Sequence, residues 1–300
     1  MTGTVSADRI CSLWPNDFPL GSSEPERAIP HYLIAHYWWA YTHPVAVRVF
    51  ERPWLVNLIL WGNYARLCNA VLAEFGESLP GRTLQVACVY GDLTPKLSRR
   101  VAQSGGLLDV VDVVPLQLQN LARKLPKAAR TRLIHMDSAK LEAPSSRYDR
   151  ALAFFLLHEQ PAAHREKTLS EIIRVVKQGG KIVIVDYALP QPWHPLRYLW
   201  RPLLATLEPF ALDLWREELT KWLPPGIPVQ TRKESFFGGL YQKVVITVEN
   251  ELAKAAGVHG TPLCEPSPAK PPTDQQNSRS RSSPKAGCAK SEPVAAHSSR

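Results

Sequence analysis

The stretch from Thr83 to Pro95, TLQVACVYGDLTP, constrains the fold more than any other part of the chain. It has a short apolar run, a turn and the start of a helical pattern, which is how a doubly wound α/β domain begins its nucleotide site. Such a turn is normally rich in glycine, because a residue without a Cβ lets the backbone approach a ligand closely. Against an acid-x-Gly-x-Gly-x-Gly pattern, only Gly91 is kept, while Gln85 replaces the acid and Ala87 and Val89 replace glycines. The turn is therefore either decayed or altered for different chemistry.

Expected strands and helices alternate from this turn onward. The strands are Thr83–Val89, Leu107–Val114, Arg132–His135, Arg150–Leu157 and Lys181–Val185. The helices between them are Leu93–Gln103, Gln117–Leu125 and Ala162–Lys177. This alternation predicts an α/β, Rossmann-like, mostly parallel sheet covered by helices on both faces, with ligands at the carboxyl ends of its strands. Two further apolar runs, 231–236 and 240–248, flank two glycines and predict a C-terminal antiparallel hairpin.

Tryptophan is concentrated in two segments that flank this core. The first segment, 31–75, reads as two or more helices and contains Trp38, Trp39, Trp54 and Trp61. The second, 192–224, contains Trp193, Trp200, Trp215 and Trp222. Its prolines Pro195, Pro202 and Pro209 recur every seven residues and predict a kinked or broken helix. Two interpretations of the first segment stay open, a helical cap packed on the core and an aromatic surface for a lipid-soluble substrate or a membrane interface.

These patterns divide the chain into parts of different composition. We expect an irregular N-terminus over 1–29, an aromatic-rich helical arm over 30–80, a Rossmann-like domain over 81–249 with an inserted lid at 190–226, and a disordered tail over 250–300. The net charge is +9, and the seven basic and four acidic residues of 251–300 leave +6 on the rest. That excess suits an anionic membrane surface or a phosphate-bearing ligand. Nucleic acid fits poorly, because there is no basic stripe interleaved with aromatics and no zinc-finger or RNA-binding signature.

Cysteine usage and the absence of targeting signals indicate where the protein works. The five cysteines are scattered without a CxxC pair, which indicates a reducing compartment and no thiolate metal cluster. The first residues have neither the apolar run of a secretory signal nor the arginine-rich character of a mitochondrial one. No stretch reaches the roughly 18 uninterrupted apolar residues of a spanning helix. We therefore expect a cytoplasmic protein that lies on the inner face of a bacterial plasma membrane.

Three acids follow expected strands and are candidates for cofactor binding. Asp112 ends the second strand, where an acid accepts hydrogen bonds from ribose hydroxyls; the alternative is a carboxylate favoured by a helix N-terminus. Asp137 follows the third strand and could contact an adenine edge, or be an ordinary turn aspartate. Asp92 follows Gly91 at the mouth of the first turn, where an acid repels phosphate. This position argues for a cationic cofactor and against a dinucleotide.

A second group of polar residues follows the next two strands. His158 and Glu159 end the fourth strand, and Asp186 and Tyr187 end the fifth. Since these ends meet at one edge of a parallel sheet, the four side chains should face one cleft, where they could hold a hard divalent ion or move protons. Tyr241 is a further candidate from the hairpin, with surface packing as its default explanation.

The motifs together carry a family resemblance. Over Gly81–Val248 the order of strands, the acid at Asp112, the pair Met136-Asp137, the LLHEQP turn and the GGKIVIVDY strand resemble class I S-adenosylmethionine-dependent methyltransferases. More specifically, the chain is similar to the RquA family of rhodoquinone biosynthesis proteins over about His31–Ile246. The motifs of that similarity are HYWWAY, NLILWGNYARL, LQVACVYGDLTP, FFLLHEQP, VDYALPQPWHPLRYLWRP and KESFFGGLYQKVVI.

The resemblance implies an activity and a set of site residues. It implies conversion of ubiquinone to rhodoquinone by replacing a ring methoxy group with an amino group, with S-adenosylmethionine as amino donor and Mn²⁺ assisting. The expected cofactor-binding residues are Gln85, Val86, Ala87, Tyr90, Gly91, Asp92, Asp112, Val113, Asp137 and Ser138. The expected catalytic residues are His158, Asp186, Tyr187 and Tyr241, and the expected Mn²⁺ ligands are His158, Glu159 and Asp186.

The neutral side chain of Gln85 agrees with such chemistry. An acid at this position would favour the protonated α-ammonium of the cofactor, and an amine must lose its proton to act as a nucleophile. Two other functions stay open at this point. One is an ordinary quinone methyltransferase with a drifted first motif, and the other is a non-catalytic protein that binds quinone or lipid.

Overall fold

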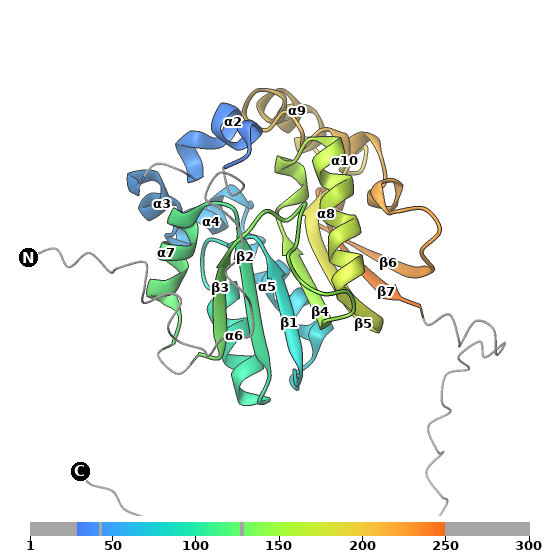
Figure 1. Ribbon diagram of the computed structural model, residues 1–300. Coiled ribbons are helices and arrows are strands. Elements are labelled where there is room, and N and C mark those ends of the chain that lie inside the picture. The colour runs from blue at the N-terminus through green and yellow to red at the C-terminus, as the bar shows by residue number, and fades with distance from the viewer. Residues whose placement is uncertain (1–28, 42–43, 127–128, 250–300) are drawn as a thin grey trace, which may run out of the picture. The chain divides into compact units, whose positions relative to one another are not determined.

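A seven-stranded sheet forms the centre of the structure, a computed structural model that describes residues 29–41, 44–126 and 129–249 (Figure 1). The strands are β1 (Arg82–Val86), β2 (Leu107–Asp112), β3 (Thr131–His135), β4 (Tyr148–Phe154), β5 (Val176–Tyr187), β6 (Val229–Phe236) and β7 (Tyr241–Val248). Their order is β3-β2-β1-β4-β5-β7-β6. The first five pair in parallel, and β7 pairs antiparallel with both β5 and β6. The predicted fold class is confirmed; the expected tail and nearly all of the expected irregular N-terminus lie outside the described residues.

Nine α-helices belong to the described residues. They are α2 (His31–Tyr41), α3 (Pro44–Phe50), α4 (Pro53–Ile59), α5 (Tyr64–Phe75), α6 (Leu93–Gln103), α7 (Pro115–Lys124), α8 (Ala162–Val175), α9 (Leu196–Leu207) and α10 (Asp213–Arg216). Short 3₁₀ turns lie at η2 (Leu157–Glu159), η3 (Leu219–Trp222) and η4 (Phe237–Gly239). In this part of the chain no helix has the length and apolar character needed to cross a bilayer.

Two hydrophobic cores form because residues alternate between the two faces of the sheet. On one face, strand residues such as Leu108 and Val110 pack with the apolar stripe Leu93, Leu97 and Val101 of α6, and α5 joins this core. On the other face, strand residues such as Ile182 and Ile184 pack against α8 and η3. Both faces are therefore covered, as a largely parallel sheet requires.

Three strands, β1, β2 and β4, end earlier than the sequence pattern predicts, and left-handed turns explain two of these ends. β1 ends at Val86 because Ala87 turns the chain with φ of 69°, and β4 ends at Phe154 because Phe155 does so with φ of 52°. Both residues have left-handed backbone conformations, which cost a residue with a Cβ about 1–2 kcal/mol. Because both segments are apolar in composition, the hydrophobic pattern alone does not predict these two turns.

The lid segment contains one longer helix. Pro195 is the residue before α9, Pro202 lies inside it, and Pro209 comes after its last turn. In Figure 1, α2 and α9 both lie over the upper end of the sheet. The two tryptophan-rich segments therefore lie over the same end of the sheet.

Candidate functional site

A cavity of about 360 Å³ lies at the carboxyl ends of the strands. Its walls come from the segments that follow the first four strands, 87–90, 111–114, 136–138 and 154–160. Residues of α2, α4 and α9 close it from above, among them Tyr32, Val56 and Leu204. Its size is within the range of small-molecule sites, about 300–1,000 Å³. The two tryptophan-rich segments therefore form a cover over the site.

The first turn presents a neutral wall to this cavity. Ala87, Cys88, Val89 and Tyr90 line it, and none of them is a carboxylate. Gln85 lies behind the turn, where its Nε2 donates to the carbonyl of Ala87 at 3.0 Å and to Thr94 Oγ1 at 2.8 Å. The amide of Gln85 therefore holds the strained turn in shape.

Asp112 connects two of the loops at the cavity wall. It accepts the backbone N–H of Cys88 at 2.7 Å and that of Val114 at 2.8 Å. Burial raises the pKa of this carboxyl, although both N–H donors act in the opposite direction. Asp112 also lines the cavity, at the end of β2.

Next to Asp112 lies a polar group from β3 and η2. Burial opposes ionisation of Asp137, but hydrogen bonds from His164 at 3.0 Å and from the N–H of Ala139 lower its pKa. Gln160 donates from Nε2 to Ser138 Oγ at 3.0 Å. Its Oε1 is buried and has no partner among the described residues. An acceptor left unpaired in a cavity wall is suited to an N–H donor of a ligand.

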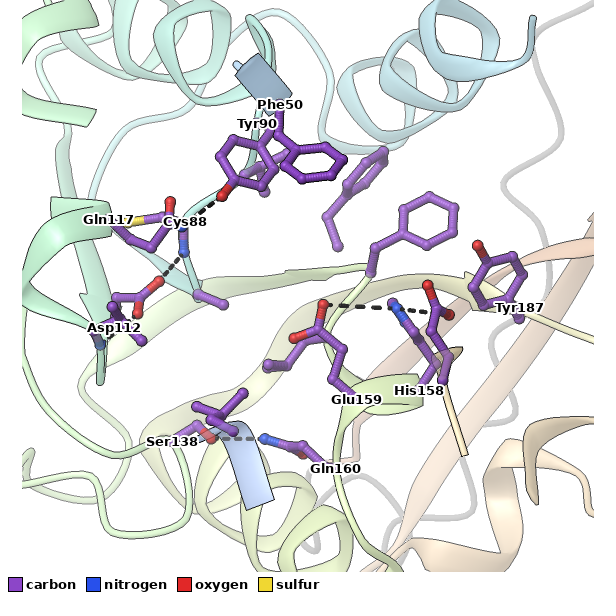
Figure 2. Close-up of a pocket in the computed structure, with 18 of the residues that line it drawn as sticks. Phe50, Cys88, Tyr90, Asp112, Gln117, Ser138, His158, Glu159, Gln160 and Tyr187 are labelled. Atoms are coloured by element: carbon purple, nitrogen blue, oxygen red, sulfur yellow. Dashed lines mark hydrogen bonds and ion pairs between the residues drawn. The ribbon is translucent and has the colours of Figure 1, made fainter. Parts of the chain in front are cut away.

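His158 occupies the opposite wall, as Figure 2 shows. Its Nδ1 lies 2.8 Å from Asp186 Oδ1, and its Nε2 lies 3.7 Å from Glu159 Oε1 and 3.5 Å from Glu208 Oε2. Burial by itself would lower the pKa of this imidazole, but the charges of Asp186 and Glu208 outweigh burial and raise it to about 9. His158 is therefore a charged acid at neutral pH.

Asp186 lies behind His158 and does not line the cavity. Its two oxygens accept N–H groups of Leu157, His158 and Tyr187 in addition to the imidazole. It thus fixes the orientation of the ring, and it has no free oxygen directed at a ligand. The expected Mn²⁺ set of His158, Glu159 and Asp186 does not fit this geometry. No group of three or more His, Cys, Asp or Glu in the described part of the chain could hold a metal ion.

Aromatic rings surround the imidazole. Tyr187 packs edge-on against His158 at 4.9 Å between ring centroids, and Phe155 lies 5.4 Å from Tyr187 and 5.7 Å from Tyr241. Tyr187 and Phe155 line the cavity, whereas Tyr241 lies behind them with its hydroxyl buried and unpartnered among the described residues. This end of the cavity suits a flat ring that carries polar oxygens.

Comparisons with known proteins agree with this architecture. A family profile described as "Methyltransferase domain" matches residues 83–180. Among solved structures, phosphoethanolamine N-methyltransferase 2 of Haemonchus contortus, in complex with S-adenosyl-L-methionine, aligns with a TM-score of 0.51 at 12% identity, over 74% of this chain and 61% of that one. The chain has the methyltransferase fold.

Curated relatives of this methyltransferase domain are similar over a limited length. The ubiquinone/menaquinone biosynthesis C-methyltransferase UbiE of Ectopseudomonas mendocina is 29% identical over 140 residues, which is 45% of this chain and 54% of the relative. The UbiE of Azotobacter vinelandii is 29% identical over 139 residues, with the same coverage. The chain thus spans about half the length of the curated relatives it matches.

The methyltransferase fold brings together many of the residues predicted from the sequence. Those that line the cavity are Ala87, Tyr90, Asp112, Val113, Asp137, Ser138, His158, Glu159 and Tyr187. Gln85, Val86, Gly91, Asp92, Asp186 and Tyr241 do not. Asp92 points to Lys96, 2.8 Å away, and not to the cavity mouth, so it gives no argument about cofactor charge. Gly91 is packed under Tyr64, whose hydroxyl would lie 2.4 Å from an added Cβ.

Gln160, Glu208 and Glu51 are among the residues in or behind the site that the sequence predictions leave out. Gln160 belongs to the LLHEQP motif but was not singled out, although its place after η2 offers a signal. Glu208, at the end of α9, and Glu51, at the end of α3, carry no such signal. Glu51 Oε1 accepts the N–H of Gly91 at 3.0 Å and pairs with Lys124 Nζ at 2.6 Å, which ties the arm to the first turn. Their partners are distant in sequence, so spacing does not reveal them.

Proposed function

We propose that this chain transfers the amino nitrogen of S-adenosylmethionine to the ring of ubiquinone, replacing a methoxy group and yielding rhodoquinone. The main observation in support of this proposal is that the first turn presents a neutral wall to the cavity. With Gln85 behind the turn, none of the side chains that the turn presents to the cavity, Ala87, Cys88, Val89 and Tyr90, is a carboxylate that would favour the protonated form of an amine. A free amine is the nucleophilic form that attack on a ring carbon requires.

The other end of the cavity supports binding of an adenosyl group. In this proposal Asp112 accepts hydrogen bonds from the ribose hydroxyls, and the unpaired Oε1 of Gln160 accepts an N–H of adenine. Bound S-adenosylmethionine supplies the group that is transferred. The similarity to UbiE proteins, whose names specify ubiquinone and menaquinone biosynthesis, supports a quinone as the acceptor.

His158 is assigned the role of general acid. A C–N bond forms at the ring carbon, the bond from that carbon to the methoxy oxygen breaks, and the methoxy group leaves as methanol after gaining a proton. In this proposal the charged imidazole, which lines the cavity, donates this proton from Nε2, while Asp186 keeps the ring oriented from Nδ1. The edge-on rings of Phe155 and Tyr187 hold the quinone ring beside it.

The nitrogen must then separate from the Cα of the donor: the two electrons of the Cα–H bond reduce the quinone to its hydroquinone, and water hydrolyses the resulting C=N bond. The products are the ring amine, as rhodoquinone in its hydroquinone form, and a 2-oxo acid.

The proposal assigns no step to Mn²⁺. The oxygens of Asp186 already accept four hydrogen bonds, so the trio expected from the sequence does not fit a divalent ion. Purified protein treated with a chelator, with and without Mn²⁺ added back, measures any requirement directly.

A doubly labelled cofactor tests the proposal. Full-length protein is incubated with ubiquinone and S-adenosylmethionine that carries ¹⁵N in the amino group and ¹³C in the transferable methyl group, and the quinones are analysed by mass spectrometry. We expect ¹⁵N in the product and no ¹³C. Transfer of ¹³C without ¹⁵N would instead establish a quinone methyltransferase, the second candidate, which the UbiE relatives favour. Unlabelled quinone and no thermal shift with S-adenosylmethionine would leave only a non-catalytic quinone- or lipid-binding protein.

A further inference from the structure

Large apolar side chains are exposed on α4 and α9, two of the helices that cover the cavity. Trp54 and Leu58 of α4 are 61% and 64% exposed, and Leu199 of α9 is 69% exposed. Tyr198 beside it is 66% exposed, and Trp61, just after α4, is 44% exposed. Such a concentration exceeds the single scattered apolar residues that are normal on a protein surface. We call Trp54, Leu58, Trp61, Tyr198 and Leu199 the α4–α9 surface.

The turn that follows α4 is in contact with α9. The rings of Trp61 and Trp200 meet edge-on at 5.2 Å between their centroids. The surface is therefore one feature of the fold, although its parts lie well over one hundred residues apart in sequence.

The α4–α9 surface continues into the cavity. Ile59, Leu203 and Leu207 line the cavity and are also 36%, 40% and 43% exposed. An apolar chain that leaves the cavity between α4 and α9 therefore meets apolar side chains along its whole path. A water-soluble substrate needs no such path, whereas a lipid that is drawn partly out of a bilayer does.

The charges near this surface are of one sign. Residues 47–66 and 191–207 contain Arg48, Arg52, Arg66, Arg197 and Arg201, and all except Arg197 are exposed. The only acid of these two ranges is Glu51, which is bound by Lys124 and by the N–H of Gly91. Exposed tryptophan beside arginine, without exposed acid, matches the headgroup region of an anionic bilayer.

We infer that the α4–α9 surface is a membrane-docking surface that inserts into the headgroup region of an anionic bilayer and opens the cavity to the lipid phase. Trp54, Leu58 and Leu199 enter the interface, and Arg52 and Arg201 contact lipid phosphates. The inference deepens the proposed function in one respect, since the isoprenoid tail of the quinone would stay in the bilayer while its ring enters the cavity. Docking itself requires no quinone.

Vesicle flotation of the full chain tests the docking without substrate or cofactor. Vesicles of phosphatidylcholine alone are compared with vesicles in which part of the lipid is phosphatidylglycerol. We expect binding to the anionic vesicles that weakens with added salt, and a loss of most binding in Trp54→Ser/Leu58→Ser/Leu199→Ser. The control Ile34→Ser/Ile227→Ser changes exposed apolar residues outside the surface and should bind like the unchanged protein.

A matched pair of charge variants tests the arginines. Arg52→Gln/Arg201→Gln should weaken binding to anionic vesicles roughly 30-fold, because each arginine near a membrane contributes about 1 kcal/mol. Arg99→Gln/Arg123→Gln removes the same charge from exposed sites on α6 and α7 and should have a much smaller effect. Equal losses in the two variants would overturn the assignment of this surface.

Two further measurements distinguish membrane docking from self-association of the chain and from a failure of the proposed function. The unchanged protein could fail to bind anionic vesicles and sediment as a dimer, with Trp54→Ser/Leu58→Ser/Leu199→Ser sedimenting as a monomer. In that case the surface is an interface between copies of the chain and the inference is wrong. Activity is measured separately on a short-chain, water-soluble quinone and on long-chain quinone in vesicles. If the triple variant loses only the activity on long-chain quinone in vesicles, the docking surface is supported. If the unchanged protein binds vesicles but acts on neither quinone, docking still holds and the proposed function is wrong.

Discussion

Two carboxylates flank the imidazole of His158, and their surroundings give them different roles. Asp186 is fully buried, and its oxygens are occupied by backbone N–H groups and by Nδ1. Glu208 faces Nε2 at 3.5 Å, and its Oε2 has no hydrogen-bond partner among the described residues. Burial raises the pKa of Glu208, while the charge of His158 lowers it. We therefore regard Asp186 as the residue that orients the ring and Glu208 as the one that tunes its acidity.

Replacing Glu208 tests this difference. Glu208→Gln keeps the shape of the side chain but removes a charge that favours the protonated imidazole, so the pKa of His158 should fall by about one unit. In a profile of kcat/KM against pH, the loss of activity at alkaline pH should begin about one unit lower. Glu217→Gln, which removes an exposed glutamate paired with Lys221, is the control. An unchanged profile in Glu208→Gln would contradict the role given to this residue.

Gln160 permits a direct test of the cofactor end. Gln160→Leu removes the buried acceptor Oε1 and should weaken binding of S-adenosylmethionine roughly 10-fold, the effect of losing one hydrogen bond of about 1.4 kcal/mol. Isothermal titration calorimetry measures the affinity. Gln103→Leu, at the exposed end of α6, should bind as the unchanged protein does. Equal affinities for the three proteins would remove Gln160 from the cofactor site.

At the level of elements, Glu51 joins the helical arm to the sheet domain. Its carboxylate accepts from the N–H of Gly91, from Asn120 and from Lys124, so it connects the end of α3 with the first turn and with α7. Lys124 also donates to the carbonyls of Val89 and Gly91. A carboxylate of the chain itself therefore satisfies an N–H of this turn.

Removing the contacts of the Glu51 carboxylate should weaken the attachment of the helical arm to the sheet domain. Glu51→Gln leaves Lys124 partly buried without its counter-charge and should lower the free energy of unfolding by about 2 kcal/mol, or the Tm by roughly 4–8 °C. Hydrogen exchange should also increase at Gly91 and across α3. Glu217→Gln again serves as the surface control. A variant that melts with the unchanged protein and exchanges no faster would show that these contacts contribute little.

The regular elements were largely predictable from the sequence, because their signals are local. The apolar stripe of α6 repeats at Leu93, Leu97 and Val101, and its predicted bounds agree with the structure. The ends of β1 and β4 were misplaced, since the left-handed turns at Ala87 and Phe155 occur within apolar runs. What a local pattern cannot predict is a contact between distant segments, such as Glu51 with Gly91 or Glu208 with His158. The sequence therefore predicted that residues from several strand ends face one cavity, but not which distant residues contact them.

Over the whole molecule, the charged imidazole should make stability depend on pH in a defined window. The pKa of His158 is raised from 6.5 to about 9 in the folded state. A raised pKa means that folding favours the protonated form, so this stabilisation is complete below pH 6.5 and is lost as the pH rises to about 9. Within the window the unfolded chain has already released a proton that the folded protein still binds.

Urea denaturation measured between pH 6 and pH 9 tests this directly. The free energy of unfolding should fall with pH by up to about 1.4 kcal/mol per unit in the unchanged protein, the limit for one proton. His158→Gln should show a shallower fall, because it has no proton to lose at this position. The buried thiols of Cys68 and Cys88 have raised pKa values from 9.0 upward and affect both proteins alike, so the difference between the two curves isolates the imidazole. Parallel curves would mean that Asp186 and Glu208 do not hold the charge on His158, and His158 would then lack the proton that its role as general acid requires.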